Sequence, residues 1–178
     1  MDGYKERIKK IIISDEEIKA AVKKAGKKID QLYNGEPILL VSILKGSFIF
    51  LADLCRAVTV PCEIGFMRAQ SYYDGTKSSG KVSITMDLEQ NLSKYHVIIV
   101  EDIIDTGKTL NEIIKIIRSK NPLSINIITL LDKPTRREVE LKPDMALFTI
   151  PDIFVIGYGL DCGEHYRNLP YIAEFCSD

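Results

Sequence analysis

The stretch YHVIIVEDIIDTGKTLNEIIKII, residues 95–117, joins an apolar strand to an amphipathic helix through a short polar turn. Residues 95–100 are typical of a buried strand, and apolar residues then recur at helical spacing, at Leu110, Ile113, Ile114 and Ile117. Between them lie Thr106, Gly107, Lys108 and Thr109. Backbone N–H groups at a helix start lack partners, and the helix dipole favours an anion there. The stretch therefore predicts a strand–turn–helix unit that binds a phosphate.

Three carboxylates stand beside this turn, those of Glu101, Asp102 and Asp105. A Walker A loop requires a glycine five residues before Gly107, where this chain has Asp102, so the motif of a kinase or NTPase is absent. Carboxylates only accept hydrogen bonds, and the adjacent hydroxyls of a sugar supply two donors. A phosphate at the turn and a diol at Glu101 and Asp102 describe a ribose 5-phosphate. Asp105 then faces what is attached to the sugar, although an isolated aspartate there is more often a helix N-cap.

The same strand–turn–helix pattern occurs earlier in the chain. The run PILLVSIL, residues 37–44, is followed by Lys45-Gly46-Ser47 and a helical apolar pattern. The runs INIITLL (125–131) and FVIGYGL (154–160) indicate two further buried strands. Ser14 and Glu17 form a capping box, which begins a helix that ends at Asn34-Gly35 and buries Ile18, Ala21, Val22, Ala25, Ile29 and Leu32. We expect an α/β fold with a mostly parallel central sheet flanked by helices.

Ligands of parallel sheets bind at the carboxyl ends of the strands. Three polar clusters follow predicted strands in this chain, at residues 45–47, 101–109 and 132–133. The sequence therefore predicts that they converge on one site. The polar segment RAQSYYDGTKSSGK, residues 68–81, allows two interpretations, a hairpin turn joining two strands or a mobile lid.

Length, charge and composition exclude several classes of protein. The 178 residues suffice for one domain, and a formal net charge of -1 provides no field for nucleic acid or an acidic membrane. Apolar runs are of strand length, so no membrane span is predicted. The four cysteines show no zinc-ligand spacing, and the charged N-terminus does not resemble a signal peptide. These features predict reduced thiols in a cytoplasmic protein without nucleic-acid or membrane partners.

The segment VIIVEDIIDTGKTL, residues 97–110, resembles the phosphoribosyl pyrophosphate (PRPP) signature of type I phosphoribosyltransferases. The rest of the chain resembles one branch of that family, the bacterial hypoxanthine and hypoxanthine-guanine enzymes. The matching segments follow the family order along nearly the whole chain: SILKGSFIF (42–50), SYYDGTKSSGKV (71–82), LLDKP (130–134) and PDIFVIGYGLDCGEHYRNLPYI (151–172). The signature alone identifies the superfamily, and the last two segments point to 6-oxopurines.

This resemblance implies the type I phosphoribosyltransferase fold as a single domain, residues 1–178, with a lid loop at about 68–81 and a small C-terminal hood at about 152–178. It implies a Mg²⁺-dependent transfer of the 5-phosphoribosyl group from PRPP to hypoxanthine or guanine, which yields IMP or GMP and pyrophosphate in purine salvage. The partners are PRPP and the 6-oxopurine, and a homodimer or homotetramer is expected.

The resemblance also assigns roles to residues. The 5-phosphate and ribose would contact Glu101, Asp102, Asp105, Thr106, Gly107, Lys108 and Thr109, with Asp105 as the catalytic residue that exchanges a proton with purine N7. Pyrophosphate would bind Lys45, Gly46 and Arg167, in a loop where the Leu44–Lys45 peptide can be cis. The purine would contact Lys133, Phe154, Val155 and Asp161, and the metal Glu101, Asp102 and Asp161. Ser71 and Tyr72 would belong to the lid.

One departure and two alternatives accompany these assignments. After Asp161 the family often carries an aromatic residue, where this chain has Cys162 and Gly163. A regulator that binds PRPP without turnover is the alternative from another class, but this chain keeps the proposed catalytic residues and lacks length for a DNA-binding module. A pyrimidine or adenine enzyme is opposed by Lys133, which the resemblance places at the 6-oxo group.

Overall fold

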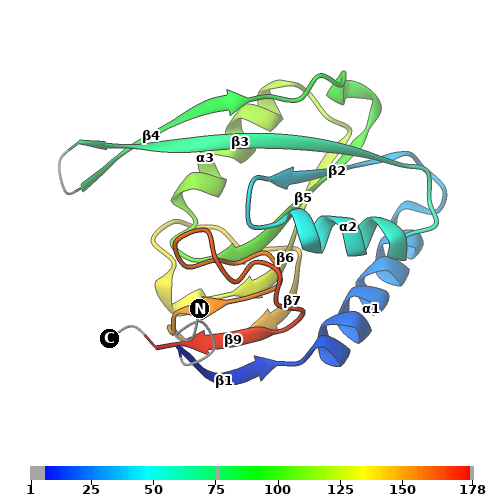
Figure 1. The fold of residues 1–178 in the computed structure, drawn as a ribbon. Helices are drawn as coiled ribbons and strands as arrows, with labels where there is room; N and C mark the ends of the chain where they lie inside the picture. The colour runs from blue at the N-terminus through cyan, green and yellow to red at the C-terminus, as the bar shows by residue number, and fades with distance from the viewer. Residues whose placement is uncertain (1–6, 75–76, 177–178) are drawn as a thin grey trace.

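A six-stranded sheet forms the centre of the computed structural model, which describes residues 7–74 and 77–176, without the side chains of residues 70–82. The strand order is β4-β3-β2-β5-β6-β7. All neighbours run parallel except β4, which is antiparallel to β3. The strands are β2 (Ile38–Ile43), β3 (Cys62–Asp74), β4 (Lys77–Met86), β5 (His96–Ile104), β6 (Ser124–Asp132) and β7 (Met145–Thr149). The expected α/β architecture is confirmed (Figure 1).

Helices cover both faces of the sheet, which explains the unbroken apolar character of its central strands. All six residues of β2 are buried. Ile38 and Leu40 pack in a core with α1 (Asp15–Tyr33) and α2 (Phe48–Ala57), whereas Leu39 and Val41 face α3 (Lys108–Ser119). Successive side chains of a strand point to opposite faces, so one strand contributes to both cores. Two short 3₁₀ helices, η1 (Leu92–Lys94) and η2 (Pro134–Arg136), lie in the connections.

Helix α1 begins and ends where the sequence predicts. Ser14 and Glu17 form the capping box, and Asn34 ends the helix in the left-handed conformation. One residue of the predicted apolar face was wrong, because Leu32 is exposed. Tyr33 is buried in its place and donates a hydrogen bond to Asn126 Oδ1 at 2.8 Å, so its ring replaces Leu32 at the end of that face.

A separate three-stranded sheet forms the hood, with the order β1-β9-β8. It joins β1 (Ile8–Ile13), β8 (Val155–Ile156) and β9 (Ile172–Phe175). The C-terminal segment expected at about 152–178 contains β8 and β9, and the structure adds the N-terminal strand β1 to the same sheet. The predicted strand at 154–160 is wrong beyond Ile156, since Gly157, Tyr158 and Gly159 have positive φ angles. That backbone turns away from a strand and forms a loop.

The polar segment at 68–81 lies in a β-hairpin. Strands β3 and β4 pair antiparallel from Arg68 opposite Met86 to Asp74 opposite Lys77, with two register shifts. The hairpin extends beyond the other strands of the sheet (Figure 1). The hairpin interpretation is thus confirmed for the backbone, while a lid role for this hairpin stays a prediction.

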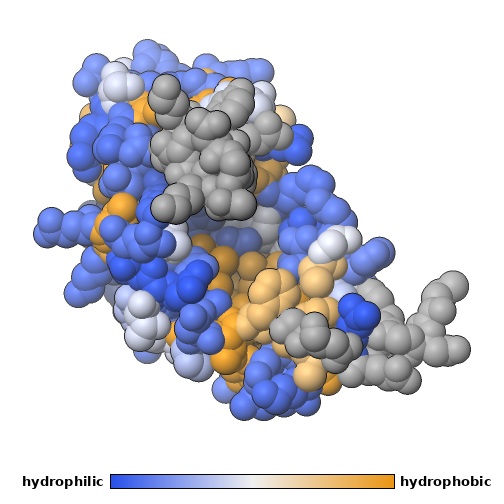
Figure 2. All heavy atoms as spheres, turned by 90° about the vertical axis from the view of Figure 1, so that its left-hand side faces the viewer, coloured by the Kyte–Doolittle hydropathy of each residue, from blue (hydrophilic) through white to orange (hydrophobic). Residues whose placement is uncertain are grey.

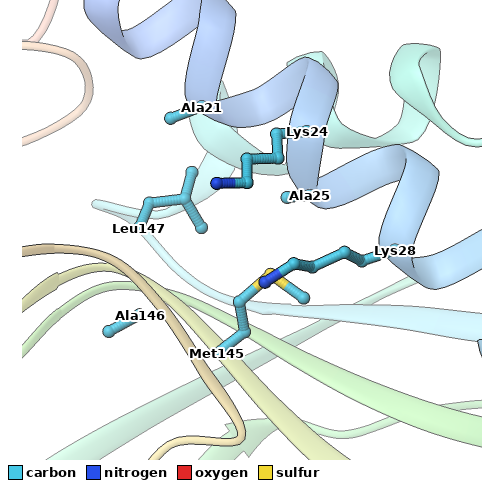
Figure 3. Close-up of a pocket in the computed structure, with 7 residues that line it drawn as sticks. All are labelled: Ala21, Lys24, Ala25, Lys28, Met145, Ala146 and Leu147. Carbon is cyan, nitrogen blue, oxygen red and sulfur yellow. The ribbon is translucent and has the colours of Figure 1, made fainter.

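A shallow pocket of about 100 Å³ lies between α1 and β7 (Figure 3). Lys24 and Lys28 extend from the helix toward Met145 and Leu147 of the strand. It contains none of the predicted site residues. Within the described residues, no helix is long and apolar enough to cross a membrane, and the four cysteines form no disulfide.

Candidate active site

The predicted site residues gather where the parallel strands end. In Figure 1, strand β2 points toward the side that Figure 2 presents to the viewer, and that face is hollowed, with hydrophobic residues below the hollow. The turns after β2, β5 and β6 all lie at this edge because the strands are parallel. The predicted convergence of the three polar clusters is therefore confirmed at the level of the backbone.

The phosphate turn adopts the geometry of a helix start. Gly107 precedes α3 with a φ of 80°, which a residue with a side chain adopts only with strain. The N–H of Lys108 donates to Thr106 Oγ1 at 3.4 Å, and the Lys108 side chain pairs with Glu138. A Cβ at Gly107 would lie 3.0 Å from Val139 Cγ2, so the turn packs closely against the segment that contains Val139. The first turn of α3 faces the site and suits an anion.

Glu101 and Asp102 form an acidic pair near the end of β5, and the Ile103 N–H donates to Asp102 Oδ1 at 2.7 Å. Burial is the main cause that raises the pKa of Asp102 to about 6, while Arg167 acts in the opposite direction. Burial, followed by repulsion from Asp102, raises the pKa of Glu101 well above its usual value. Partly buried carboxylates of this kind are stabilised by hydroxyl donors or by a cation.

The carboxylate of Asp102 lies directly against the backbone of Gly46. A Cβ at position 46 would stand 1.5 Å from Asp102 Oδ2, and a Cβ at Gly159 would stand 2.0 Å from the Gly46 carbonyl oxygen. The loop after β2 therefore contacts both Asp102 and the loop of residues 157–161. The preceding peptide, Leu44–Lys45, is cis.

Asp105 is held by two arginines that sequence reasoning missed. Arg136 Nε donates to Asp105 Oδ1 at 3.0 Å, and Arg137 Nη1 donates to the Asp105 carbonyl oxygen at 2.5 Å. Arg136 also lies 3.6 Å from Asp152, and Arg137 pairs with Asp132. The adjacent arginines after Lys133-Pro134 were the available signal. Asp105 does not cap α3, whose N-cap is Gly107, and its carboxylate pairs with Arg136 instead.

A carboxylate–cation cluster surrounds the predicted pyrophosphate residues. Arg167 Nη2 lies 2.9 Å from Asp161 Oδ1 and 3.1 Å from Glu164 Oε2, and its Nη1 donates to the Gly159 carbonyl at 2.8 Å. Lys45 Nζ lies 2.9 Å from Glu164 Oε1. The Arg167 Nε is buried without a hydrogen-bond partner among the described residues. Such an orphaned donor calls for an acceptor that a bound anion supplies. Glu164 was not predicted to take part.

The predicted purine residues lie just after β6 and at the start of β8. Lys133 is buried, and its Nζ donates to the Ile153 carbonyl oxygen at 2.7 Å and lies 3.7 Å from Asp152. Phe154 is half exposed and packs edge-on against Phe175, with ring centroids 5.7 Å apart. Val155 is buried in β8 opposite Glu174. An exposed ring beside a buried lysine suits a flat heterocycle with a carbonyl group.

The two predicted lid residues belong to the hairpin. Ser71 and Tyr72 lie in β3, with Ser71 paired to Val82, and their side chains fall outside the described residues. Asp161 pairs with Arg167 and accepts a hydrogen bond from the Glu164 N–H, so its side chain lies with the predicted pyrophosphate residues. Its predicted role at the purine stays a prediction.

The donor set fits a magnesium ion only with the help of a substrate. No group of three or more His, Cys, Asp or Glu that would hold a metal occurs in the described part of the chain. Mg²⁺ commonly binds one or two carboxylates together with substrate phosphates and water. Burial raises the pKa values of Glu101 and Asp102, and a bound cation would stabilise their charged forms.

Comparison with known proteins agrees with this geometry. Residues 11–162 match the family described as phosphoribosyl transferase domain. The chain is 46% identical over 167 residues to the hypoxanthine phosphoribosyltransferase of Buchnera aphidicola subsp. Schizaphis graminum, covering 93% of this chain and 94% of that protein. It is 47% identical over 166 residues to the hypoxanthine-guanine phosphoribosyltransferase of Streptococcus pneumoniae, covering 93% and 92%.

The fold comparison gives the same result. The crystal structure of a hypoxanthine phosphoribosyltransferase from Staphylococcus aureus superposes with a TM-score of 0.93 at 40% identity, covering 96% of this chain and 93% of that one. A hypoxanthine-guanine phosphoribosyltransferase from Bacillus anthracis superposes with a TM-score of 0.91 at 43% identity, covering 95% and 99%. This chain belongs to the phosphoribosyltransferase family, in its hypoxanthine and hypoxanthine-guanine branch.

Proposed function

We propose that this protein transfers the 5-phosphoribosyl group of PRPP to the ring nitrogen of a 6-oxopurine, hypoxanthine or guanine, in purine salvage. The observation that carries the proposal is the position of Asp105. It lies between the phosphate turn before α3 and, through Arg136 and Asp152, the buried Lys133. The sugar phosphate and the base would therefore meet at its carboxylate.

The chain's own residues would each perform one task in this reaction. The turn at 106–109 holds the 5-phosphate, and Glu101 and Asp102 accept hydrogen bonds from the ribose hydroxyls. Lys133 donates to the 6-oxo group, Phe154 stacks on the ring, and the Val155 backbone faces its edge. The C1–oxygen bond to pyrophosphate breaks as the nitrogen–C1 bond forms, and the departing electron pair goes to pyrophosphate.

Asp105 would act at the base and at the sugar. Its carboxylate exchanges a proton with purine N7 and stabilises the positive charge that develops on the ribose ring. Arg136 orients this carboxylate through the contact of 3.0 Å between Nε and Oδ1. The hairpin of β3 and β4, with Ser71 and Tyr72, would cover the centre and exclude water.

We also propose Mg²⁺ as the cofactor, held by Glu101, Asp102 and Asp161 together with substrate oxygens. When bound, it would neutralise charge on the leaving pyrophosphate. Lys45, Gly46 and Arg167 would bind the pyrophosphate itself, the two side chains by charge and Gly46 by close backbone approach. The buried Nε of Arg167 supports this assignment because it lacks a partner among the described residues.

Self-association, as a homodimer or homotetramer in the cytoplasm, completes the proposal. Phe48, Phe66 and Met86 are exposed and line one hollow of about 510 Å³ together with Lys45, Glu164 and Arg167, so this apolar surface adjoins the proposed pyrophosphate site. Ile64 extends the same apolar surface along β3. Exposed apolar patches of this kind mark association surfaces. Sedimentation equilibrium would show an oligomer, and a monomer at all concentrations would contradict this part.

The decisive assay measures turnover of PRPP and Mg²⁺ with hypoxanthine, guanine, xanthine, adenine and uracil in parallel. Conversion of hypoxanthine or guanine, with little conversion of adenine or uracil, is the expected result. PRPP binding without conversion of any base would instead indicate a regulator. An arm with EDTA tests the metal: undiminished turnover would contradict the Mg²⁺ proposal and leave the transferase proposal intact.

A further inference from the structure

Glu164 forms ion pairs with both cationic residues of the proposed pyrophosphate site, Lys45 and Arg167. Its Oε1 lies 2.9 Å from Lys45 Nζ, and its Oε2 lies 3.1 Å from Arg167 Nη2. The two oxygens of one carboxylate therefore bridge a lysine in the loop after β2 and an arginine near the hood. Such a carboxylate resembles a phosphate group, because it is an anion that accepts hydrogen bonds from both cations.

The local backbone is built to present this side chain. Cys162 and His165 form an antiparallel bridge, with N–H to carbonyl hydrogen bonds of 3.2 Å in both directions. The two residues between them, Gly163 and Glu164, have φ angles of 61° and 68°. Two-residue turns with positive φ at both positions normally contain Gly or Asn, so a glutamate there costs strain.

The strained turn is also anchored. The Glu164 N–H donates to Asp161 Oδ2 at 2.8 Å, which ties the turn to a residue of the same site. Gly163 has open space around its Cβ position and supplies the first positive φ. The Cys162-Gly163 pair, which departs from the family pattern, thus forms the turn that places Glu164.

Arg167 has contacts that do not involve Glu164. Its Nη1 donates to the Gly159 carbonyl oxygen at 2.8 Å, and its Nη2 lies 2.9 Å from Asp161 Oδ1. The Glu164 side chain is 62% exposed, whereas that of Arg167 is 18% exposed. An exposed carboxylate on a turn leaves its partners at little cost, since such pairs contribute little in water.

We propose that Glu164 is an affinity-determining residue, whose carboxylate competes with the pyrophosphate group for Lys45 and Arg167. This inference rests on the proposed function, in which those two cations bind pyrophosphate. PRPP displaces the Glu164 carboxylate from Lys45 and Arg167 when it binds. The carboxylate pairs with these residues again when pyrophosphate leaves. The competition weakens the binding of PRPP and pyrophosphate and assists pyrophosphate release.

The test compares the wild-type protein with Glu164→Gln by isothermal titration of pyrophosphate in the presence of Mg²⁺. The variant should bind pyrophosphate about two- to tenfold more tightly, the range expected for removing two exposed ion pairs. IMP, which lacks a pyrophosphate group, should bind both proteins equally. Glu89→Gln removes the same charge from the exposed connection between β4 and η1, and its pyrophosphate affinity should match the wild type.

Glu164→Ala provides a second variant and should change affinity in the same direction. Unchanged or weaker pyrophosphate binding in variants that still bind IMP would overturn the inference, and weaker binding would make Glu164 a residue that positions Lys45 and Arg167. A wild-type protein that binds neither pyrophosphate nor PRPP would overturn the proposed function together with this inference. The IMP titration separates these results from a general loss of folding.

Discussion

The carboxylate of Asp102 occupies the space in which a side chain at Gly46 would lie, with Oδ2 at 1.5 Å from the position of its Cβ. The end of β5 and the loop after β2 therefore approach each other at a distance that only glycine allows. Because Asp102 is one of the proposed ribose and metal residues, this contact connects the packing of the loop to the proposed chemistry.

Gly46→Ala tests that contact. The added methyl group must displace the Asp102 carboxylate or the loop, at a cost of about 1–3 kcal/mol in the free energy of unfolding. The ratio kcat/KM for PRPP should fall at the same time, by tenfold or more. Urea denaturation and steady-state kinetics measure the two effects.

Gly35→Ala is the matched control for Gly46→Ala. Gly35 has a φ of 90° and no atom within 4 Å of its Cβ position, so alanine there causes backbone strain without a clash. It should lower stability by about 1 kcal/mol and leave kcat/KM unchanged. If Gly46→Ala also left kcat/KM unchanged, the close approach of Gly46 to Asp102 would not matter for activity.

Asp105→Asn tests the proposed catalytic residue. An asparagine keeps the shape of the side chain and can still contact Arg136, but it loses the charge that accepts a proton and stabilises the sugar. We expect kcat to fall by ~10²-fold or more. The affinity for IMP, measured by titration, should change much less, and near wild-type turnover would exclude the acid–base role.

Lys133→Met tests recognition of the base. Methionine fills a similar volume among buried neighbours but cannot donate to a 6-oxo group. Losing a charge-assisted hydrogen bond of about 1.5–3 kcal/mol should raise KM for hypoxanthine by about 10- to 100-fold. KM for PRPP should stay within a small factor, and an equal increase for both substrates would indicate a structural effect instead.

The acidic pair predicts how stability depends on pH in the absence of metal. Burial raises the pKa of Asp102 from 3.8 to about 6, and that of Glu101 also rises. In that window the folded state holds protons that the unfolded state has released, so stability falls as pH rises from about 4 to about 6.

Asp102→Asn should remove part of this slope and stabilise the metal-free protein at pH 7, by about 1–3 kcal/mol. Urea denaturation of both proteins between pH 4 and pH 8, with EDTA present, measures the difference. Identical pH profiles would show that Asp102 carries no unfavourable charge in the folded state.

The central part of this site could be predicted because its determinants are local. The strand, the turn and α3 follow one another within residues 95–117, and their apolar periods and Gly107 are visible in the sequence. The convergence of the other turns then follows from the parallel sheet. The same reasoning failed for Leu32, where Tyr33 takes the buried position through its bond to Asn126.

The missed parts depend on contacts between distant residues. Glu164 meets Lys45 only because the loop at 157–161 packs against Gly46, and no spacing in the sequence reports that packing. Strands β1 and β9 are far apart in the sequence and are not joined by a tight turn. The sequence therefore contains no hairpin motif that would predict their pairing. The loop after Ile156 contains non-glycine residues with positive φ, and Tyr158 in particular has a side chain typical of a strand.

The hood sheet has a consequence for the order of folding. Strand β1 pairs with β9, with Ile8 opposite Phe175, so the chain must bring together segments from opposite ends of the described residues. Closing so long a loop carries an entropic cost that the local β5–α3 unit does not have. We expect the β5–α3 unit, which contains the proposed phosphate turn, to form early. The packing of Phe154 on Phe175 would form late, because it depends on the pairing of β1 with β9. The residues proposed to bind the sugar phosphate would then become ordered before those proposed to bind the base.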